Sequence, residues 1–217
     1  MLTIIAVYYF LQVKNKFDLN VVWMMCAMTV SFVVRNTSPI GWPLALLIKA
    51  VHDRSLIPFA IAGITVFLPI MGLATVMDSF YYGFKEHFPV VTALTFLNIN
   101  LGKSLSSYFG TDPVHYYFTF AMPCYYTVIL PFIFISWFTY FKDMVFVAKR
   151  VPYLLIIVLS YLAVYSLIPH KEVRFILPTV PLCILILADA ISKQVKDATS
   201  FNLFNFKRKI ITLLLLA

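Results

Sequence analysis

Residues 55–77 read SLIPFAIAGITVFLPIMGLATVM, and this stretch decides the fold class. It carries no charged side chain and is longer than the roughly 20 apolar residues that a helix needs to cross a bilayer. Two further runs, Phe118–Phe141 and Val151–Pro169, come close to or exceed that length. The sequence therefore predicts an all-α polytopic membrane protein with several transmembrane helices.

The composition supports the same class. The chain is 62% hydrophobic and only 12% charged, whereas a soluble domain carries about 25% charged residues. A net charge of +8 is explained by basic cytoplasmic loops, so no nucleic-acid partner is expected. Cys26, Cys124 and Cys183 lie in apolar stretches without metal-ligand or disulfide spacing. No P-loop, Rossmann, GxSxG or HExxH motif is present, so we expect neither a metal nor a soluble cofactor.

Three shorter apolar runs complete the predicted bundle. Phe175–Asp189 contains Pro178 and Pro181, so we expect it to cross as a kinked helix supported by its neighbours. Val21–Val34 and Ile40–Val51 are shorter still and are expected to form a tight helical hairpin.

Lysine and arginine are distributed unevenly between alternate loops. Residues 49–54, 142–150 and 193–209 together hold ten of them, whereas 78–117 and 170–174 hold four. Because positively charged loops remain in the cytoplasm, we expect the second set of loops to face the lumen.

The segment 78–117 is expected to be a functional luminal loop, as long loops in compact proteins usually are. Its apolar middle, Phe88–Leu101, is expected to lie in the membrane interface or to re-enter the membrane. At its start, Asp78, Tyr81 and Tyr82 suit a sugar, since a carboxylate accepts hydroxyl hydrogen bonds while rings cover the apolar face. The same tyrosines are equally typical of an interfacial aromatic belt.

The stretch HKEVRF, residues 170–175, separates two apolar runs. A charge at the bilayer centre costs at least ~2.5 kcal/mol, so we expect this turn at the luminal surface. Lys171 and Arg174 supply donors for an anion, the arginine in a fork that suits phosphate. Glu172 would hold a neighbour in place, and His170 could donate or shuttle a proton. The alternative is a surface turn whose charges pair only with one another.

Two more residues are candidates on the predicted luminal side. His115 lies among aromatic residues, where a histidine is more often structural than functional. Arg35 lies at the luminal end of its predicted hairpin, where it would be a second phosphate contact or an anchor at the headgroup level.

Two of these motifs resemble those of a known family. HKEVRF is similar to the HKE-x-RF motif of the membrane mannosyltransferases that use dolichyl-phosphate mannose in the endoplasmic reticulum (ER) lumen. DSFYYG, residues 78–83, resembles the acid-aromatic-glycine motif of the same family. Residues 100–123 and 35–42 are most similar to the branch that adds the third mannose, α1,2-linked, to the glycosylphosphatidylinositol (GPI) precursor. Asn36 replaces a proline of that branch, so the mannosyltransferases of lipid-linked oligosaccharide assembly remain competitors.

The resemblance implies a partial GT-C glycosyltransferase helix bundle, an inverting transfer and donor phosphate binding near the charged turn. Its implied partners are dolichyl-phosphate mannose, a glycolipid acceptor and membrane lipids; protein partners stay unknown. The substrate-binding residues that it implies are His170, Lys171, Glu172, Arg174, Asp78, Tyr81, Tyr82, His115 and Arg35.

The family's catalytic acid loop, an HPDE-like motif, has no counterpart in this sequence, and the chain stops inside the apolar run KIITLLLLA. We therefore expect residues 1–217 to be a fragment that forms one multi-helix transmembrane domain, from the C-terminal side of a longer enzyme, with no known catalytic base and inactive alone. A lipid-linked substrate transporter or scramblase and a non-catalytic subunit are the alternatives from other classes. A transporter would show polar residues at mid-helix, but the middles of two predicted spans hold only Ser, Thr and Tyr.

Overall fold

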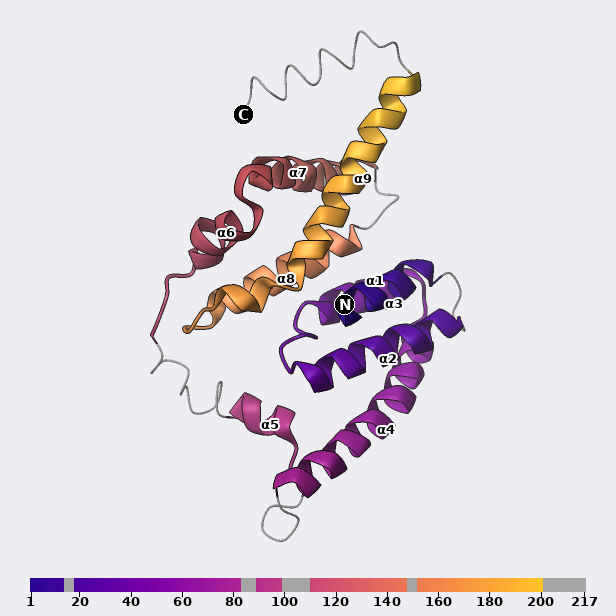
Figure 1. Cartoon of the computed structure of the whole chain (residues 1–217). Helices are drawn as coiled ribbons and strands as arrows, with labels where there is room; N and C mark the ends of the chain where they lie inside the picture. The colour runs from indigo at the N-terminus through magenta and orange to yellow at the C-terminus, as the bar shows by residue number, and fades with distance from the viewer. Residues whose placement is uncertain (14–17, 83–88, 99–109, 148–151, 201–217) are drawn as a thin grey trace.

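The computed structural model describes residues 1–13, 18–82, 89–98, 110–147 and 152–200, and the regular elements in these ranges are all helical. The all-α prediction is confirmed. The α-helices (Figure 1) are α1 (Leu2–Gln12), α2 (Leu19–Val34), α3 (Trp42–His52), α4 (Leu56–Tyr82), α5 (Thr92–Leu97), α6 (Met122–Tyr126), α7 (Leu130–Val147), α8 (Tyr153–Leu167) and α9 (Thr179–Ser200). A π-helix covers Tyr117–Ala121, and 3₁₀ helices cover Thr127–Ile129 and Val173–Ile176.

The helices run between two ends of the molecule. In Figure 1, α2, α4 and α8 run toward the lower left of the view, and α9 runs back to the upper right. The connection from α2 to α3 and the one from α8 to α9 therefore lie at the same end. We expect both connections to face the lumen, since Arg35 lies in the first and residues 170–174 lie in the second.

The helices pack in a different order from that predicted for the first part of the chain. α1 lies along α2, and α2 packs on α4, whereas α3 packs mainly on α8. α9 covers both α7 and α8. The predicted hairpin of Val21–Val34 and Ile40–Val51 is therefore wrong as a packed pair. The physical reason lies in the connecting loop, which is hydrogen-bonded to α8 and so directs α3 onto that helix.

The predicted span Phe118–Phe141 is not one regular helix. Its first turn is the π-helix, and the chain breaks again at Thr127, whose φ is +42°. A proline lacks the N–H that would bond to the carbonyl four residues earlier, and its ring clashes with that carbonyl. Pro131 stands four residues after Thr127, and Pro123 stands four residues after Thr119 in the π-helix. Both irregularities therefore have a proline as their cause.

The predicted kinked helix Phe175–Asp189 is also corrected. Pro178 lies just before α9 and Pro181 lies in its first turn. The N–H groups of the first turn have no partner within a helix, so a proline there costs no hydrogen bond and need not kink the helix. Residues 173–176 form the separate 3₁₀ helix instead.

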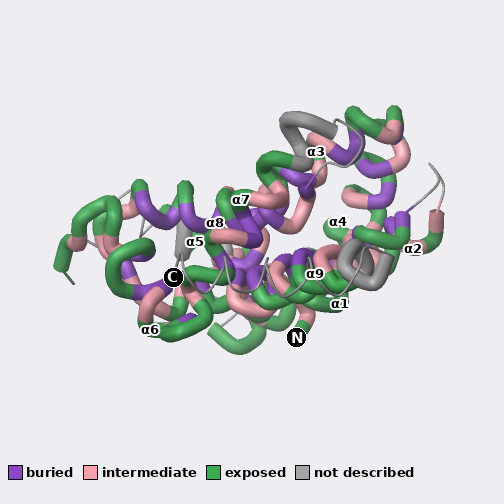
Figure 2. The backbone as a smooth tube through the Cα atoms, turned by 90° about the horizontal axis from the view of Figure 1, so that it is seen from above, coloured by how far each residue is buried: buried purple, intermediate pink, exposed green. Residues whose placement is uncertain are grey.

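Two described segments are long and apolar enough to cross a membrane, the 27 residues of α4 and the 26 residues of Tyr117–Lys142. At 1.5 Å per residue, α4 is about 40 Å long and exceeds the ~30 Å hydrocarbon core, whereas the 15 residues of α8 reach only about 22 Å. Figure 2 shows buried residues along α8, while α4 exposes large apolar side chains such as Leu68 and Leu73. Exposed apolar faces of this kind suit lipid.

Candidate functional site

The charged turn, His170–Arg174, connects α8 to the 3₁₀ helix that follows. Within it, Glu172 is the common acceptor. Arg174 donates to both Glu172 carboxylate oxygens, through Nε to Oε2 and through Nη2 to Oε1 at 3.0 Å. The Nε2 atom of His170 lies 3.2 Å from the same Oε1 atom. The pairing predicted for Glu172 is thus present, and it holds the arginine fork in a fixed orientation.

The electrostatics of this cluster keep Glu172 ionised. Partial burial acts to raise the pKa of the carboxyl, but hydrogen bonds from Arg174 and His170 outweigh it and lower the pKa below its usual value. The Arg174 side chain is 71% exposed. Its guanidinium therefore sits at the surface, where an anion from outside the chain can reach it.

Lys171 has a different environment from its neighbours. It is only 5% exposed, and its Nζ atom donates to the carbonyls of Asp112 and Ile168, at 2.8 Å each. The backbone N–H of Asp112 donates in turn to the carbonyl of Pro169 at 3.1 Å. Lys171 thus joins the segment before the π-helix to the turn. The structure supports a structural role for this ammonium, and anion binding by it stays a prediction.

Arg35 reaches the charged turn from 139 residues earlier in the chain. Its Nη2 atom donates to the backbone carbonyl of Arg174 at 2.5 Å, and its Nε atom donates to the Thr37 hydroxyl at 3.0 Å. The structure therefore brings the two predicted arginines to one place. Arg35 lies at the backbone of the turn, and Arg174 projects from it.

A set of aromatic rings from α8 holds the loop after α2 in place. The Tyr161 hydroxyl donates to the Ser38 carbonyl, and the Tyr165 hydroxyl donates to the Thr37 carbonyl at 2.9 Å. The Tyr165 ring stacks on Phe175, with centroids 5.2 Å apart. A Cβ atom at Gly41 would lie 2.2 Å from Cδ2 of Tyr161, so only glycine permits this approach. These contacts fix the position of Arg35, the first residue of that loop.

Tyr125, in α6, makes one more hydrogen bond to the charged turn. Its hydroxyl donates to the carbonyl of Val173 at 3.1 Å. Sequence reasoning missed this residue together with Tyr161 and Tyr165. The last two are four residues apart and therefore share one helix face, which is the signal that could have identified them.

His115 lies near the turn but does not join the cluster. Its side chain is exposed, and its carbonyl accepts the N–H groups of Phe118 and Thr119 at 3.0 Å each. The described contacts of His115 are thus made by its backbone, and a role of its side chain in substrate binding stays a prediction.

Asp78, Tyr81 and Tyr82 lie elsewhere, and they are part of α4 rather than of a loop. α4 runs through all three residues to Tyr82, and the Ser79 hydroxyl donates to the Thr75 carbonyl at 2.7 Å. The Asp78 carboxylate accepts the Thr92 hydroxyl. Tyr81 is 82% exposed. Figure 1 places this end of α4 at the bottom of the view, away from the turn between α8 and α9.

The predicted loop 78–117 is corrected accordingly. Its residues 78–82 are helical and belong to α4, and its last residue, Tyr117, begins the π-helix. Within the interfacial segment Phe88–Leu101, residues 89–98 are described and include the short helix α5, and the others lie outside the described ranges. No group of three His, Cys, Asp or Glu side chains among the described residues could hold a metal ion.

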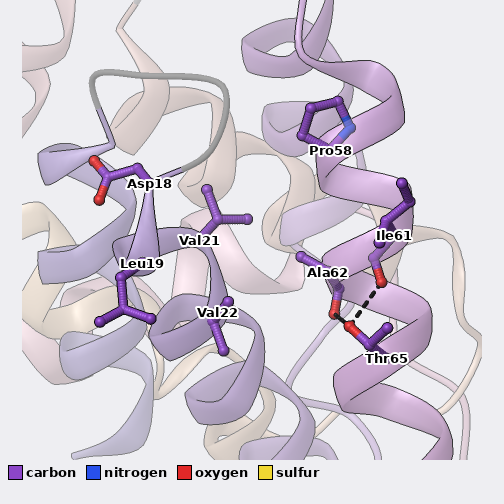
Figure 3. Close-up of a pocket in the computed structure, with 8 residues that line it drawn as sticks. All are labelled: Asp18, Leu19, Val21, Val22, Pro58, Ile61, Ala62 and Thr65. Atoms are coloured by element: carbon purple, nitrogen blue, oxygen red, sulfur yellow. Dashed lines mark hydrogen bonds between the residues drawn. The ribbon is translucent and has the colours of Figure 1, made fainter.

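A cavity of about 340 Å³ lies between α2 and α4, near the opposite end of α2 (Figure 3). Asp18 is the charged residue among the described residues that line the cavity. The Oδ1 atom of Asp18 accepts a hydrogen bond from the N–H of Asn20 at 3.0 Å and thereby caps α2. In Figure 3 the Asp18 carboxylate points away from α4, while the Thr65 hydroxyl bonds to its own helix. None of the described residues that line this cavity is a cation, whereas Arg35 and Arg174 meet at the charged turn.

The comparison with known proteins identifies the family of the chain. Residues 1–217 match the Alg9-like mannosyltransferase family over their whole length. The chain belongs to this family. Among curated relatives, GPI alpha-1,2-mannosyltransferase 3 of Bos taurus is 29% identical over 185 residues, which is 85% of this chain and 32% of the relative. GPI mannosyltransferase 3 of Drosophila melanogaster is 34% identical over 63% of this chain and 24% of its own length.

A plant member of the Alg9-like family matches over more of the chain. Mannosyltransferase APTG1 of Arabidopsis thaliana is 25% identical over 212 residues, which is 96% of this chain and 36% of the relative. The chain thus spans about a third of the length of the curated relatives it matches. No solved structure matches it.

Proposed function

We propose that this chain contributes to a mannosyltransferase that moves mannose from dolichyl-phosphate mannose to the growing GPI precursor in the ER membrane. We propose an α1,2 linkage and the third mannose. The charged turn binds the donor phosphate on the luminal side.

The observation that carries the proposal is the pair of arginines at the turn. Glu172 holds the Arg174 fork in one orientation, and Arg35 lies beside the same backbone. Arginine forks bind phosphate with two parallel hydrogen bonds. When the bond between mannose C1 and the phosphate oxygen breaks, negative charge grows on the leaving dolichyl phosphate. Fixed donors at that position lower the barrier.

The acceptor hydroxyl attacks C1 as this bond breaks, and its proton passes to a base. We do not assign that base to Glu172. Two donors lower its pKa, and an effective general base has a pKa nearer to the working pH. Glu172 therefore positions Arg174.

The choice of acceptor is supported by the relatives. Two of those described above bear the name GPI mannosyltransferase 3 or GPI alpha-1,2-mannosyltransferase 3. A lipid-linked oligosaccharide acceptor is the competing outcome of the test below.

A chimera tests the proposal directly. This chain replaces the matching third of the bovine relative, and the chimera is expressed in cells that lack their own enzyme for the third mannose. We expect the GPI precursor to gain one α1,2-linked mannose, measured by mass spectrometry and linkage-specific mannosidase digestion. The same chimera with Arg174→Ala is the control and should restore much less product at equal abundance.

The other outcomes decide against the proposal. Extension of a lipid-linked oligosaccharide would reassign the acceptor. A chimera that is abundant and membrane-inserted, yet lengthens neither glycan, would remove the assignment to GPI transfer and favour a transporter or a non-catalytic role.

The luminal side of the turn is tested by cysteine labelling. Cys26, Cys124 and Cys183 are first replaced, and Glu172→Cys is then compared with His52→Cys, which lies at the C-terminal end of α3. In sealed ER microsomes, a membrane-impermeant maleimide should label residue 52 at once and residue 172 only after permeabilisation. The reverse pattern would overturn the luminal assignment.

A further inference from the structure

A groove of about 450 Å³ opens beside the charged turn. Its walls come from the start of α1, the last turn of α2 with the loop after it, and the start of α9 with the two residues before it. Ligand pockets commonly measure about 300–1,000 Å³. The groove is therefore large enough to hold part of a ligand, and it begins where Arg35 contacts the turn.

One part of the groove is polar. Arg35 lines it, with two of its five N–H groups bonded to Thr37 and to the carbonyl of Arg174. Ser38 lines it too and is only 4% exposed, and its hydroxyl has no hydrogen-bond partner among the described residues. Buried hydroxyls are nearly always paired. Because Ser38 and Arg35 line the same groove, a ligand held there can supply the hydrogen-bond partner that this hydroxyl lacks among the described residues.

The rest of the groove is mainly apolar. Val34 contributes from α2 and Leu2 from α1, and the α9 side is formed by Leu177, Pro178, Val180 and Pro181. An arginine and a hydroxyl beside a hydrocarbon wall complement a molecule with an anionic head and an apolar chain. In a membrane protein, such a molecule is a lipid.

We infer that this groove binds the first part of the hydrocarbon chain of a lipid phosphate. Arg35 and the Ser38 hydroxyl contact phosphate oxygens, and the chain lies against Val34 and the residues that lead into α9. The inference rests on the proposed function, in which the donor is a lipid phosphate, and adds the path of its chain. Arg35 donates to the backbone carbonyl of Arg174, which places the groove directly beside the charged turn.

The adjacent residues Val34 and Val33 allow a matched test. Both are exposed, at 75% and 41%, but only Val34 lines the groove. The chain is placed in nanodiscs of zwitterionic lipid, and binding of a long-chain polyprenyl phosphate is measured. We expect Val34→Trp to fill the groove and weaken binding by about tenfold or more, whereas Val33→Trp stays within about twofold.

A second probe separates this inference from the proposed function. Isopentenyl phosphate carries the same head on a short chain, and inorganic phosphate has no chain. Val34→Trp should bind isopentenyl phosphate as the wild type does, while Arg174→Ala should lose affinity for both lipid probes. If Val34→Trp leaves long-chain binding unchanged, or the long chain adds no affinity over the short one, the groove assignment is overturned and the phosphate site stands. If the wild type binds none of the three probes, the phosphate site itself fails.

Ser38→Ala tests the unpaired hydroxyl. Loss of one neutral hydrogen bond between the serine and the ligand should weaken polyprenyl phosphate binding by about threefold to tenfold. Because the hydroxyl has no partner within the described chain, the melting temperature without ligand should not fall. A lower melting temperature with unchanged affinity would show a purely structural serine and overturn its assignment.

Discussion

Replacing Arg174 with alanine is expected to weaken donor binding by roughly tenfold to a hundredfold. Hydrogen bonds to a charged group contribute about 1.5–3 kcal/mol, and each 1.4 kcal/mol is a factor of about ten in affinity. Arg174 is exposed and projects from the turn, so its removal should leave the fold intact. The measurement is the apparent Kd of dolichyl-phosphate mannose for nanodisc-embedded protein, normalised to folded molecules.

Two further variants sharpen this result. Arg174→Lys keeps the charge but loses the fork, so its affinity should fall between those of the wild type and Arg174→Ala. Glu172→Gln should have a smaller effect than Arg174→Ala, because Glu172 orients the arginine and does not itself hold phosphate. An unchanged Kd in Arg174→Ala, with lower abundance of the protein, would instead identify the turn as purely structural.

The helical class and the family could both be recognised from sequence, because apolar length and the HKEVRF motif are local signals. The break at Thr127 was missed for a reason that is also local. The sequence contains Pro123 and Pro131, but the apolar length of Phe118–Phe141 indicates one continuous helix. Each proline prevents the hydrogen bond to the carbonyl four residues earlier and clashes with that carbonyl. Asp78 was placed in a loop because it is the first charged residue after an apolar run. A single carboxylate near the interface does not end a helix.

The meeting of Arg35 with the charged turn could not be predicted from one sequence. The contact joins residues 139 positions apart, and it depends on Tyr161 and Tyr165 holding the loop after α2 against α8. Local patterns describe which face of α8 carries these tyrosines. These patterns do not say which loop accepts hydrogen bonds from the two tyrosine hydroxyls, because the choice of loop depends on the packing of the whole bundle.

Lys171 shows the same limit within the motif itself. In sequence, Lys171 and Arg174 are two cations in one short turn, and both suit an anion. In the structure, one ammonium is buried against two carbonyls and the other cation is exposed. The sequence gives the sign of each charge. The direction of a side chain in an irregular turn is decided by the groups that surround it.

Lys171→Met is therefore expected to lower stability strongly and to leave donor affinity per folded molecule almost unchanged. The variant keeps most of the apolar stem but leaves the carbonyls of Asp112 and Ile168 without their donor. Because hydrogen bonds to a charged group contribute about 1.5–3 kcal/mol, the loss should be about 3 kcal/mol. The measurement is the free energy of unfolding in detergent, together with the Kd used for Arg174.

Lys142→Met is the matched control for this loss. Its ammonium lies 4.7 Å from the centre of the Phe138 ring and is exposed, so its removal should cost less than about 1 kcal/mol. Arg174→Ala and Lys171→Met should then show opposite effects, the first on affinity with stability kept and the second on stability with affinity kept. A tenfold weaker Kd for folded Lys171→Met would contradict this division, because it would mean that the ammonium leaves its carbonyls and joins Arg174 in holding the phosphate.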